Sequence, residues 1–124
     1  MQIKIKHVYI GLIITVAVAI VALAGFSMTG YFSAPAGRYD NFAKCLTQKG
    51  VAMYGAEWCS HCKNQKLMFG DSFKYVTYVE CTTDEAECTA KGVTGYPTWI
   101  IDGKAYPGEQ SLESLSTLAG CPLE

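Results

Sequence analysis

The sequence has no run of basic residues and no basic stretch interleaved with aromatic side chains. Nucleic-acid-binding domains carry such a patch, so the chain is not expected to bind nucleic acid. It also contains no internal repeat and no low-complexity tract. At 124 residues it is long enough for one folded domain with an appendage.

The sequence also has few cysteines or histidines spaced like the ligands of a zinc site. There are six cysteines and two histidines, but Cys59 and Cys62 form the only Cys-x-x-Cys pair. A zinc site would need two more ligands at short spacing. Cys81 and Cys88 are the remaining candidates and are not spaced that way. Zinc is therefore an alternative for this pair, and we expect no metal.

Charge is missing from residues 8–26, which are almost entirely apolar. About twenty apolar residues span the hydrocarbon core of a membrane as one helix. Lys4 and Lys6 precede the run, and Arg38 is the next charged residue. The positive-inside rule then places the N-terminus in the cytoplasm and the rest outside. Residues 1–27 are thus predicted to be a cytoplasmic tip and transmembrane anchor of a single-pass cell-membrane protein.

A cleavable signal peptide is the alternative for the same residues. Ala22-Leu23-Ala24 fits the small-x-small pattern before a cleavage point, but the apolar run is longer than a usual signal core of roughly 7–15 residues. Either interpretation exports the remainder of the chain. Residues 28–39 are predicted to be a linker and residues 40–124 the folded domain, whose even number of cysteines suits an oxidising compartment.

Residues 40–124 alternate between helical and strand patterns. We expect Asp40 or Asn41 to cap the first helix, Ser111 to cap the last one, and Asp102-Gly103 to form a hairpin turn. In chain order the pattern predicts a helix over 42–48, a strand over 51–54, a helix over 63–69, a strand over 73–79, a helix over 85–91, strands over 99–101 and 104–106, and a helix over 112–119.

The pair Cys59 and Cys62 follows the first predicted strand and opens the second predicted helix. Unpaired backbone N–H groups and the positive dipole end at a helix start favour a thiolate on Cys59. A thiolate attacks disulfides, and Cys62 lies one helical turn on. The pair therefore predicts dithiol–disulfide exchange, with Cys59 as the attacking sulfur and Cys62 as the resolving one.

The order of elements, together with this pair and with Tyr-Pro-Thr before the third strand, resembles the thioredoxin fold. More closely, four segments are similar to the thioredoxin-like domain fused to bacterial homologues of vitamin K epoxide reductase: Met53–Cys62, Gln65-Lys66, Tyr78–Cys81 and Gly95–Trp99. The resemblance covers about residues 40–121. It implies an α/β domain with a central mixed sheet flanked by helices, which passes oxidising equivalents to folding proteins outside the membrane.

The resemblance also implies roles for single residues. Pro97 matches the cis proline that faces the active cysteines, which leaves the backbone of Tyr96 to pair with an extended substrate. Trp58 matches the tryptophan that flanks the site. His61 resembles the histidine of oxidising members of the superfamily, where an imidazolium stabilises the first thiolate. Met53 departs from thioredoxins, which carry there a buried acid that relays the proton of the resolving cysteine.

The other four cysteines are expected to form structural disulfides. A local Cys81–Cys88 bond is geometrically easy, and the resembled subgroup carries such a pair. If all six cysteines form disulfides, Cys45 pairs with Cys121 and links the first helix to the end of the last one. The chain-entropy gain from their loop of about 76 residues would be roughly 4 kcal/mol.

These observations predict a membrane-anchored extracytoplasmic thiol–disulfide oxidoreductase that promotes disulfide formation in cysteine-containing exported proteins. Its redox-active disulfide would serve without any other cofactor. No quinone-binding membrane domain accompanies it, so a quinone-linked oxidase would act in trans. Two alternatives stay open: a reductant of the same fold, and a non-catalytic binding domain stapled by disulfides.

Overall fold

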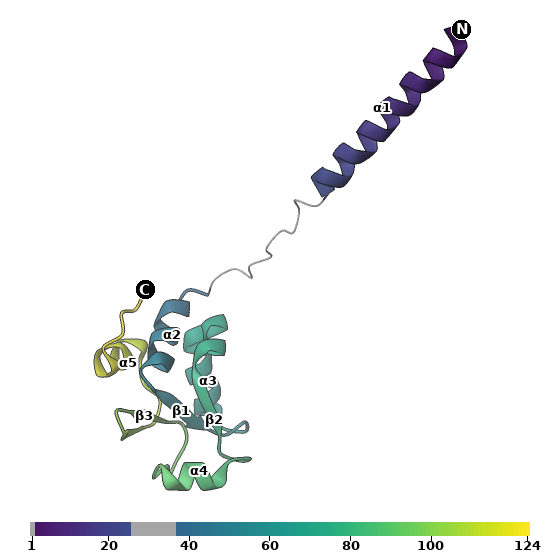
Figure 1. Cartoon of the computed structure of the whole chain (residues 1–124). Coiled ribbons are helices and arrows are strands. Elements are labelled where there is room, and N and C mark those ends of the chain that lie inside the picture. Colours follow the sequence, from purple (N-terminus) through teal and green to yellow (C-terminus); the bar gives the residue numbers. More distant parts are fainter. Residues whose placement is uncertain (1, 26–36) are drawn as a thin grey trace. The chain divides into compact units, whose positions relative to one another are not determined.

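The computed structural model describes residues 2–25 and 37–124. The chain divides into two units, Met1–Ala34 and Pro35–Glu124. The first contains helix α1 (Gln2–Gly25), and the second contains every other helix and strand (Figure 1).

The membrane anchor predicted for residues 1–27 is not found in the structure. Within the described residues, no helix is long and apolar enough to cross a membrane. The linker predicted for residues 28–39 lies mostly outside the described residues.

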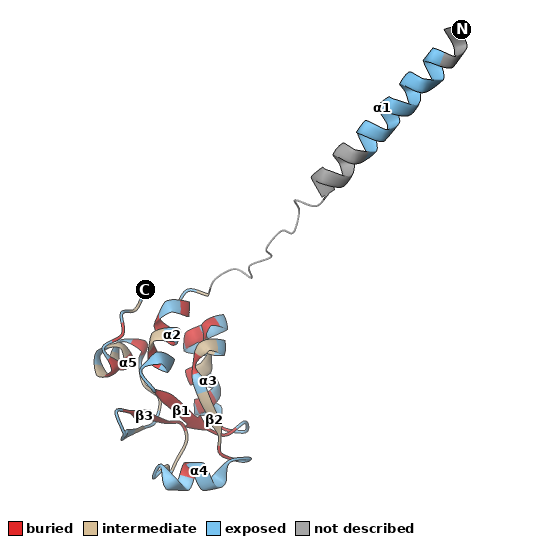
Figure 2. Ribbon diagram, in the orientation of Figure 1, coloured by how far each residue is buried: buried red, intermediate tan, exposed pale blue. Residues whose placement is uncertain are grey.

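A four-stranded mixed sheet forms the centre of the second unit, in the order β2-β1-β3-β4. Strand β1 (Ala52–Gly55) runs parallel to β2 (Thr77–Glu80) and antiparallel to β3 (Thr98–Ile101). Strand β4 (Lys104–Pro107) pairs antiparallel with β3. The central pair, β1 and β3, is buried along its whole length (Figure 2), as expected for strands covered on both faces.

Helices cover both faces of this sheet. One face packs against α2 (Asp40–Gln48), α3 (Ser60–Phe69) and α5 (Leu112–Ala119), and the other against the short α4 (Glu85–Ala90). The alternation of side chains along β1 explains this division. Met53 joins the cluster under α2, α3 and α5, whereas Ala52 and Tyr54 join the cluster against α4.

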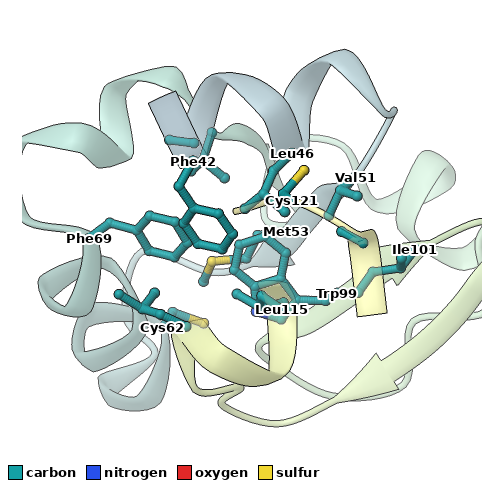
Figure 3. Close-up of a cluster of buried hydrophobic side chains, with 14 of the residues drawn as sticks. Phe42, Leu46, Val51, Met53, Cys62, Phe69, Trp99, Ile101, Leu115 and Cys121 are labelled. Atoms are coloured by element: carbon teal, nitrogen blue, oxygen red, sulfur yellow. The ribbon is translucent and has the colours of Figure 1, made fainter. Parts of the chain in front are cut away.

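The larger cluster is an apolar core built from all three helices and the two central strands (Figure 3). Phe42 of α2 stacks on Phe69 of α3, with ring centroids 5.7 Å apart. Trp99 of β3 is completely buried beside Phe69, at 5.9 Å. This packing holds α3 against the sheet, and α3 is the helix that begins at the cysteine pair.

Two of the predicted local signals behave as expected. The Ser111 hydroxyl caps α5 by accepting a hydrogen bond from the Ser114 N–H, at 3.1 Å. Asp102 and Gly103 both have positive φ, 49° and 75°, and they connect β3 to β4 as a two-residue turn of the kind that matches the twist of a hairpin.

The strand predicted for residues 73–79 is wrong in its first half. Residues Gly70–Tyr75 form a 3₁₀ helix, η1, and β2 starts only at Thr77. The aromatic alternation reflects packing rather than pleating, because the Phe73 ring lies edge-on between the rings of Phe69 and Tyr78, each at 5.9 Å.

The cap predicted at Asp40 or Asn41 is also wrong. Helix α2 begins at Asp40, and Tyr39, which precedes it, makes no side-chain capping bond. Asp40 instead turns back and accepts a hydrogen bond from the Gly37 N–H, at 3.0 Å. Helix α3 begins at Ser60, directly after Cys59, as the prediction of Cys59 at a helix start requires, and so includes the three residues before the regular helical pattern of 63–69.

Two disulfides brace the domain. Cys45–Cys121 joins α2 to the end of the chain after α5 across 76 residues, and Cys81–Cys88 joins the end of β2 to α4 across seven. Because loop-closure entropy grows with loop length, the first bond constrains the unfolded chain more than the second.

Replacing Cys45 and Cys121 together by alanine should therefore cost about 4 kcal/mol of unfolding free energy, against about 2.5 kcal/mol for the Cys81–Cys88 pair. Urea unfolding of both double variants measures the difference. Equal losses would mean that local packing, and not loop closure, sets the contribution of each bond.

Candidate active site

Cys59 is the N-cap residue of α3. Its Sγ accepts a hydrogen bond from the Cys62 N–H at 3.1 Å, and its thiol donates to the Tyr96 carbonyl at 3.6 Å. The sulfur thus sits where backbone donors and the helix dipole stabilise negative charge. This is the arrangement that an attacking sulfur needs.

Cys62 lies deeper, one turn into α3, with only 1% of its surface exposed. Burial, reinforced by the hydrogen bond with Cys59, raises the pKa of the Cys62 thiol to about 11. The nearby Lys66 ammonium opposes this rise. Cys62 is therefore a neutral thiol at physiological pH, while Cys59 is more accessible, and neither belongs to a structural disulfide.

The loop before β3 forms the wall opposite the cysteines. The Tyr96–Pro97 peptide bond is cis, and the Tyr96 carbonyl faces Cys59. The Pro97 carbonyl accepts a hydrogen bond from the Gly108 N–H at 2.7 Å, which ties the loop to the end of β4. Trp58 meets the Tyr96 ring edge-on at 5.9 Å.

An open cleft of about 470 Å³ lies between this loop and the start of α3. Trp58 stands at its side with 67% of its surface exposed, an unusual position for so large an apolar side chain. The cleft is lined by Trp58, Cys59, Ser60, His61, Thr94, Gly95 and Tyr96. It can admit an extended segment of another protein.

The His61 side chain, predicted to stabilise the Cys59 thiolate, pairs with a carboxylate instead. The His61 Nδ1 lies 2.6 Å from the Glu109 carboxylate, and Asn64 contacts the same oxygen at 3.5 Å. The His61 side chain is 70% exposed. His61 is thus hydrogen-bonded to Glu109 while it lines the cleft, and its predicted influence on Cys59 stays a prediction.

Gln65 is a positioning residue that sequence reasoning missed. It is fully buried, and its carbonyl oxygen accepts hydrogen bonds from the Trp99 indole at 3.0 Å and the Gln110 N–H at 2.7 Å. Its amide donates to the Gln110 carbonyl at 2.9 Å. These bonds fix α3 to β3 and to the segment before α5. A polar residue three positions after Cys62 gave no sign of such partners in the sequence.

The described residues contain no group of three or more histidine, cysteine, aspartate or glutamate side chains placed to hold a metal ion. Met53, which stands where thioredoxins carry a buried acid, is fully buried in the core. The chemistry of this site is that of its two sulfurs.

The same chemistry is named in the relatives of this chain, although no family model matches it. Thiol-disulfide oxidoreductase LTO1 of Arabidopsis thaliana is 42% identical over 91 residues, covering 66% of this chain and 24% of that protein. Protein disulfide isomerase-like 2-2 of Oryza sativa subsp. japonica is 38% identical over 77 residues, covering 49% of this chain and 20% of the relative.

The mixed sheet, the cysteine pair at the start of α3 and the cis Tyr96–Pro97 bond are the features that the sequence resemblance to the thioredoxin fold implies. The first thioredoxin domain of mouse protein disulfide-isomerase A4 is similar at 18% identity with a TM-score of 0.42, covering 76% of this chain and 85% of that one. The chain spans about a quarter or less of the two curated relatives.

The folded domain should react with iodoacetamide at Cys59 first. The raised pKa of Cys62 keeps its thiol neutral well above pH 8, and the neutral thiol is a poor nucleophile. Mass spectrometry of the reduced pair, alkylated briefly at pH 7 to 10, measures both positions. Faster modification of Cys62 would reverse the assignment of attacking and resolving sulfurs.

Proposed function

We propose that this protein is a thiol–disulfide oxidoreductase that introduces disulfides into cysteine-containing exported proteins. The observation that carries the proposal is the position of Cys59: at the start of α3, hydrogen-bonded through its sulfur, and beside an open cleft. The names of the relatives support the class of chemistry.

The reaction begins from a Cys59–Cys62 disulfide. A substrate thiolate attacks the Cys59 sulfur, the bond between the two cysteines breaks, and Cys62 leaves with the electron pair and takes up a proton. A second substrate thiolate then attacks the substrate sulfur of the mixed disulfide. Cys59 leaves as a thiolate, stabilised by the Cys62 N–H and the helix start, and the substrate keeps the new disulfide.

The oxidising direction is supported by the surroundings of Cys59. The Cys62 N–H and the start of α3 stabilise a thiolate on Cys59. This stabilises the reduced form of the pair, so the oxidised pair tends to pass its disulfide to a substrate.

The cleft supplies the means to hold an extended substrate. The exposed face of Trp58 offers apolar contact area, and the Tyr96 backbone borders the cleft beside Cys59. Main-chain pairing at such an edge recognises backbone rather than sequence. This suits a protein that acts on many unfolded chains.

The compartment is part of the proposal. Structural disulfides such as Cys45–Cys121 and Cys81–Cys88 persist in oxidising compartments. The apolar run over residues 8–26 and the lysines before it support export and anchoring at the cell membrane. A membrane quinone-linked oxidase acting in trans would re-oxidise the pair, as in the proteins with fused vitamin K epoxide reductase homologues that the sequence resembles.

Oxidation of a reduced, unfolded test protein measures the proposed activity. The full chain with its pair oxidised should form substrate disulfides, Cys59→Ser should be inactive, and Cys62→Ser should not be oxidisable at the pair. The Cys81→Ala/Cys88→Ala variant, which loses one disulfide away from the cleft and keeps the Cys59–Cys62 pair, is the control and should keep its activity. Failure of the oxidised parent to form substrate disulfides would mean that the domain is a binding module. Oxidation by Cys59→Ser at the parent rate would mean that the Cys59–Cys62 pair is not the active centre.

A membrane-impermeant thiol reagent applied to intact cells tests the compartment. After mild reduction, Cys59 should be labelled from outside, as should a cysteine introduced at the exposed Leu67. Labelling of both only after lysis would place the domain on the other side of the membrane and remove exported proteins as substrates.

A further inference from the structure

Cys62 must lose or gain a proton in every turnover, yet it is almost completely buried. The position of the usual buried acid is occupied by Met53, whose side chain cannot accept a proton. The ionisable groups that act on Cys62 are Cys59 and Lys66 on α3. The hydroxyl of Tyr78 on the neighbouring strand β2 also interacts with both cysteines.

Gly55, at the end of β1, brings Cys62 and Tyr78 together. A Cβ added at Gly55 would lie 2.9 Å from the Cys62 sulfur and 3.1 Å from the Tyr78 hydroxyl oxygen. Both atoms therefore lie close to one point, and the two distances limit their separation to about 6 Å. A side chain at Gly55 would have to displace one of them, since no real Cβ tolerates a contact below 3.0 Å.

A hydrogen bond links the Tyr78 hydroxyl to a carboxylate that is partly exposed to solvent. It donates a hydrogen bond to the Glu80 Oε2 at 2.7 Å. Glu80 is only half-buried, and its other oxygen accepts from the Glu57 N–H at 3.1 Å and from the Thr82 hydroxyl at 2.8 Å. Burial acts to raise the pKa of Glu80, but hydrogen bonds from Tyr78 and Thr82 outweigh it and hold the pKa below its ordinary value. Glu80 is thus a carboxylate at neutral pH.

We propose that Tyr78 and Glu80 form the proton path of Cys62 in place of the missing buried acid. The proposal rests on the redox role of the Cys59–Cys62 pair. When Cys62 attacks a mixed disulfide on Cys59, its proton passes through one bridging water to the Tyr78 oxygen, while the Tyr78 proton passes to Glu80 and then to solvent. The sulfur–sulfur bond to the substrate breaks, and the substrate leaves as a thiolate with the electron pair.

In the oxidising direction the same path runs in reverse. Cys62 is a poor leaving group as a thiolate because of its raised pKa. A proton delivered through Tyr78 as the bond between the two cysteines breaks removes this obstacle. The Lys66 ammonium lies 3.7 Å from the centre of the Tyr78 ring, where its attraction to the ring face helps to hold the ring in place.

The reaction of the reduced full chain with 5,5′-dithiobis(2-nitrobenzoate) isolates this step. In a first phase Cys59 attacks the reagent and releases one nitrothiobenzoate. In a second phase Cys62 attacks the mixed disulfide and releases another. Stopped-flow absorbance at several pH values separates the two phases, and repetition in D₂O reports proton transfer in the second.

Tyr78→Phe removes only the hydroxyl, and Glu80→Gln replaces the carboxylate by a neutral amide of the same shape, which cannot accept a proton. Both should slow the second phase at pH 7 by about a hundredfold, the lower end of the range for positioned proton transfer, and leave the first phase unchanged. In the variants the second phase should rise tenfold per pH unit with the thiolate fraction and lose its solvent isotope effect, whereas the parent protein should show a flatter profile. Gly55→Ala, which separates the two groups, should behave like Tyr78→Phe.

Tyr54→Phe is the matched control. Tyr54 is also a strand tyrosine with its hydroxyl on a glutamate, Glu87, at 3.3 Å, but it packs in the cluster against α4 on the other face of the sheet. It should leave both phases unchanged. A second phase in Tyr78→Phe that matches the parent in rate, pH profile and isotope effect would overturn the proposal.

A slower second phase with the parent pH profile and isotope effect would also overturn it, because that result describes a purely structural role. The test is independent of the proposed function as a whole, since the reagent needs no protein substrate. A domain that fails to oxidise proteins but keeps a Tyr78-dependent second phase would refute the function and retain the proton path.

Discussion

Strand β1 is the element on which the active site depends, because it is hydrogen-bonded on both sides and buried on both faces. Its pairing with β2 and β3 fixes the register that sets Met53 beside both Tyr78 and Trp99. The strand ends at Gly55, close to the start of α3 at Ser60. The sulfurs therefore lie where the sheet, the helix and the Tyr96–Pro97 loop meet, and none of them can move without disturbing the core.

The burial that gives this precision also creates the chemical difficulty of the site. A thiol enclosed by apolar side chains resists ionisation, since the charged form loses its solvation. For Cys62 this disfavours both attack on a mixed disulfide and departure as a thiolate unless a proton is transferred. It also requires a way for a proton to reach a sulfur that has almost no contact with water. A hydroxyl on the neighbouring strand that leads to a half-buried carboxylate meets this requirement without placing a charge in the core.

The parts of the fold that depend on local sequence could be predicted. The helix start at Cys59, the turn at Asp102-Gly103 and the cap at Ser111 each depend on residues within a few positions of one another. The 3₁₀ helix through Phe73 could not be predicted, because the spacing of its aromatic residues matches the alternation of a strand. The conformation of this segment depends instead on the packing of Phe73 against Phe69 and Tyr78.

The candidate site divides in the same way. The sequence motifs alone predict the roles of Cys59, Cys62 and Pro97. Glu109, whose carboxylate holds His61 from 48 residues away, gives no local sign, because proximity of this kind is set by the sheet register and helix packing. The approach of Tyr78 to Cys62 depends on the lack of a side chain at Gly55, which becomes meaningful only when β1 and β2 are side by side.

The reduction potential of the Cys59–Cys62 pair tests the central claim most directly. The full chain is equilibrated in glutathione buffers of graded ratio, quenched, and alkylated with a mass tag that counts the two thiols. We expect a single two-electron transition with a midpoint above about −200 mV, in the range of oxidising members of the superfamily. A midpoint at or below about −270 mV, the value typical of thioredoxin, or the absence of any transition at these two cysteines, would contradict an oxidant.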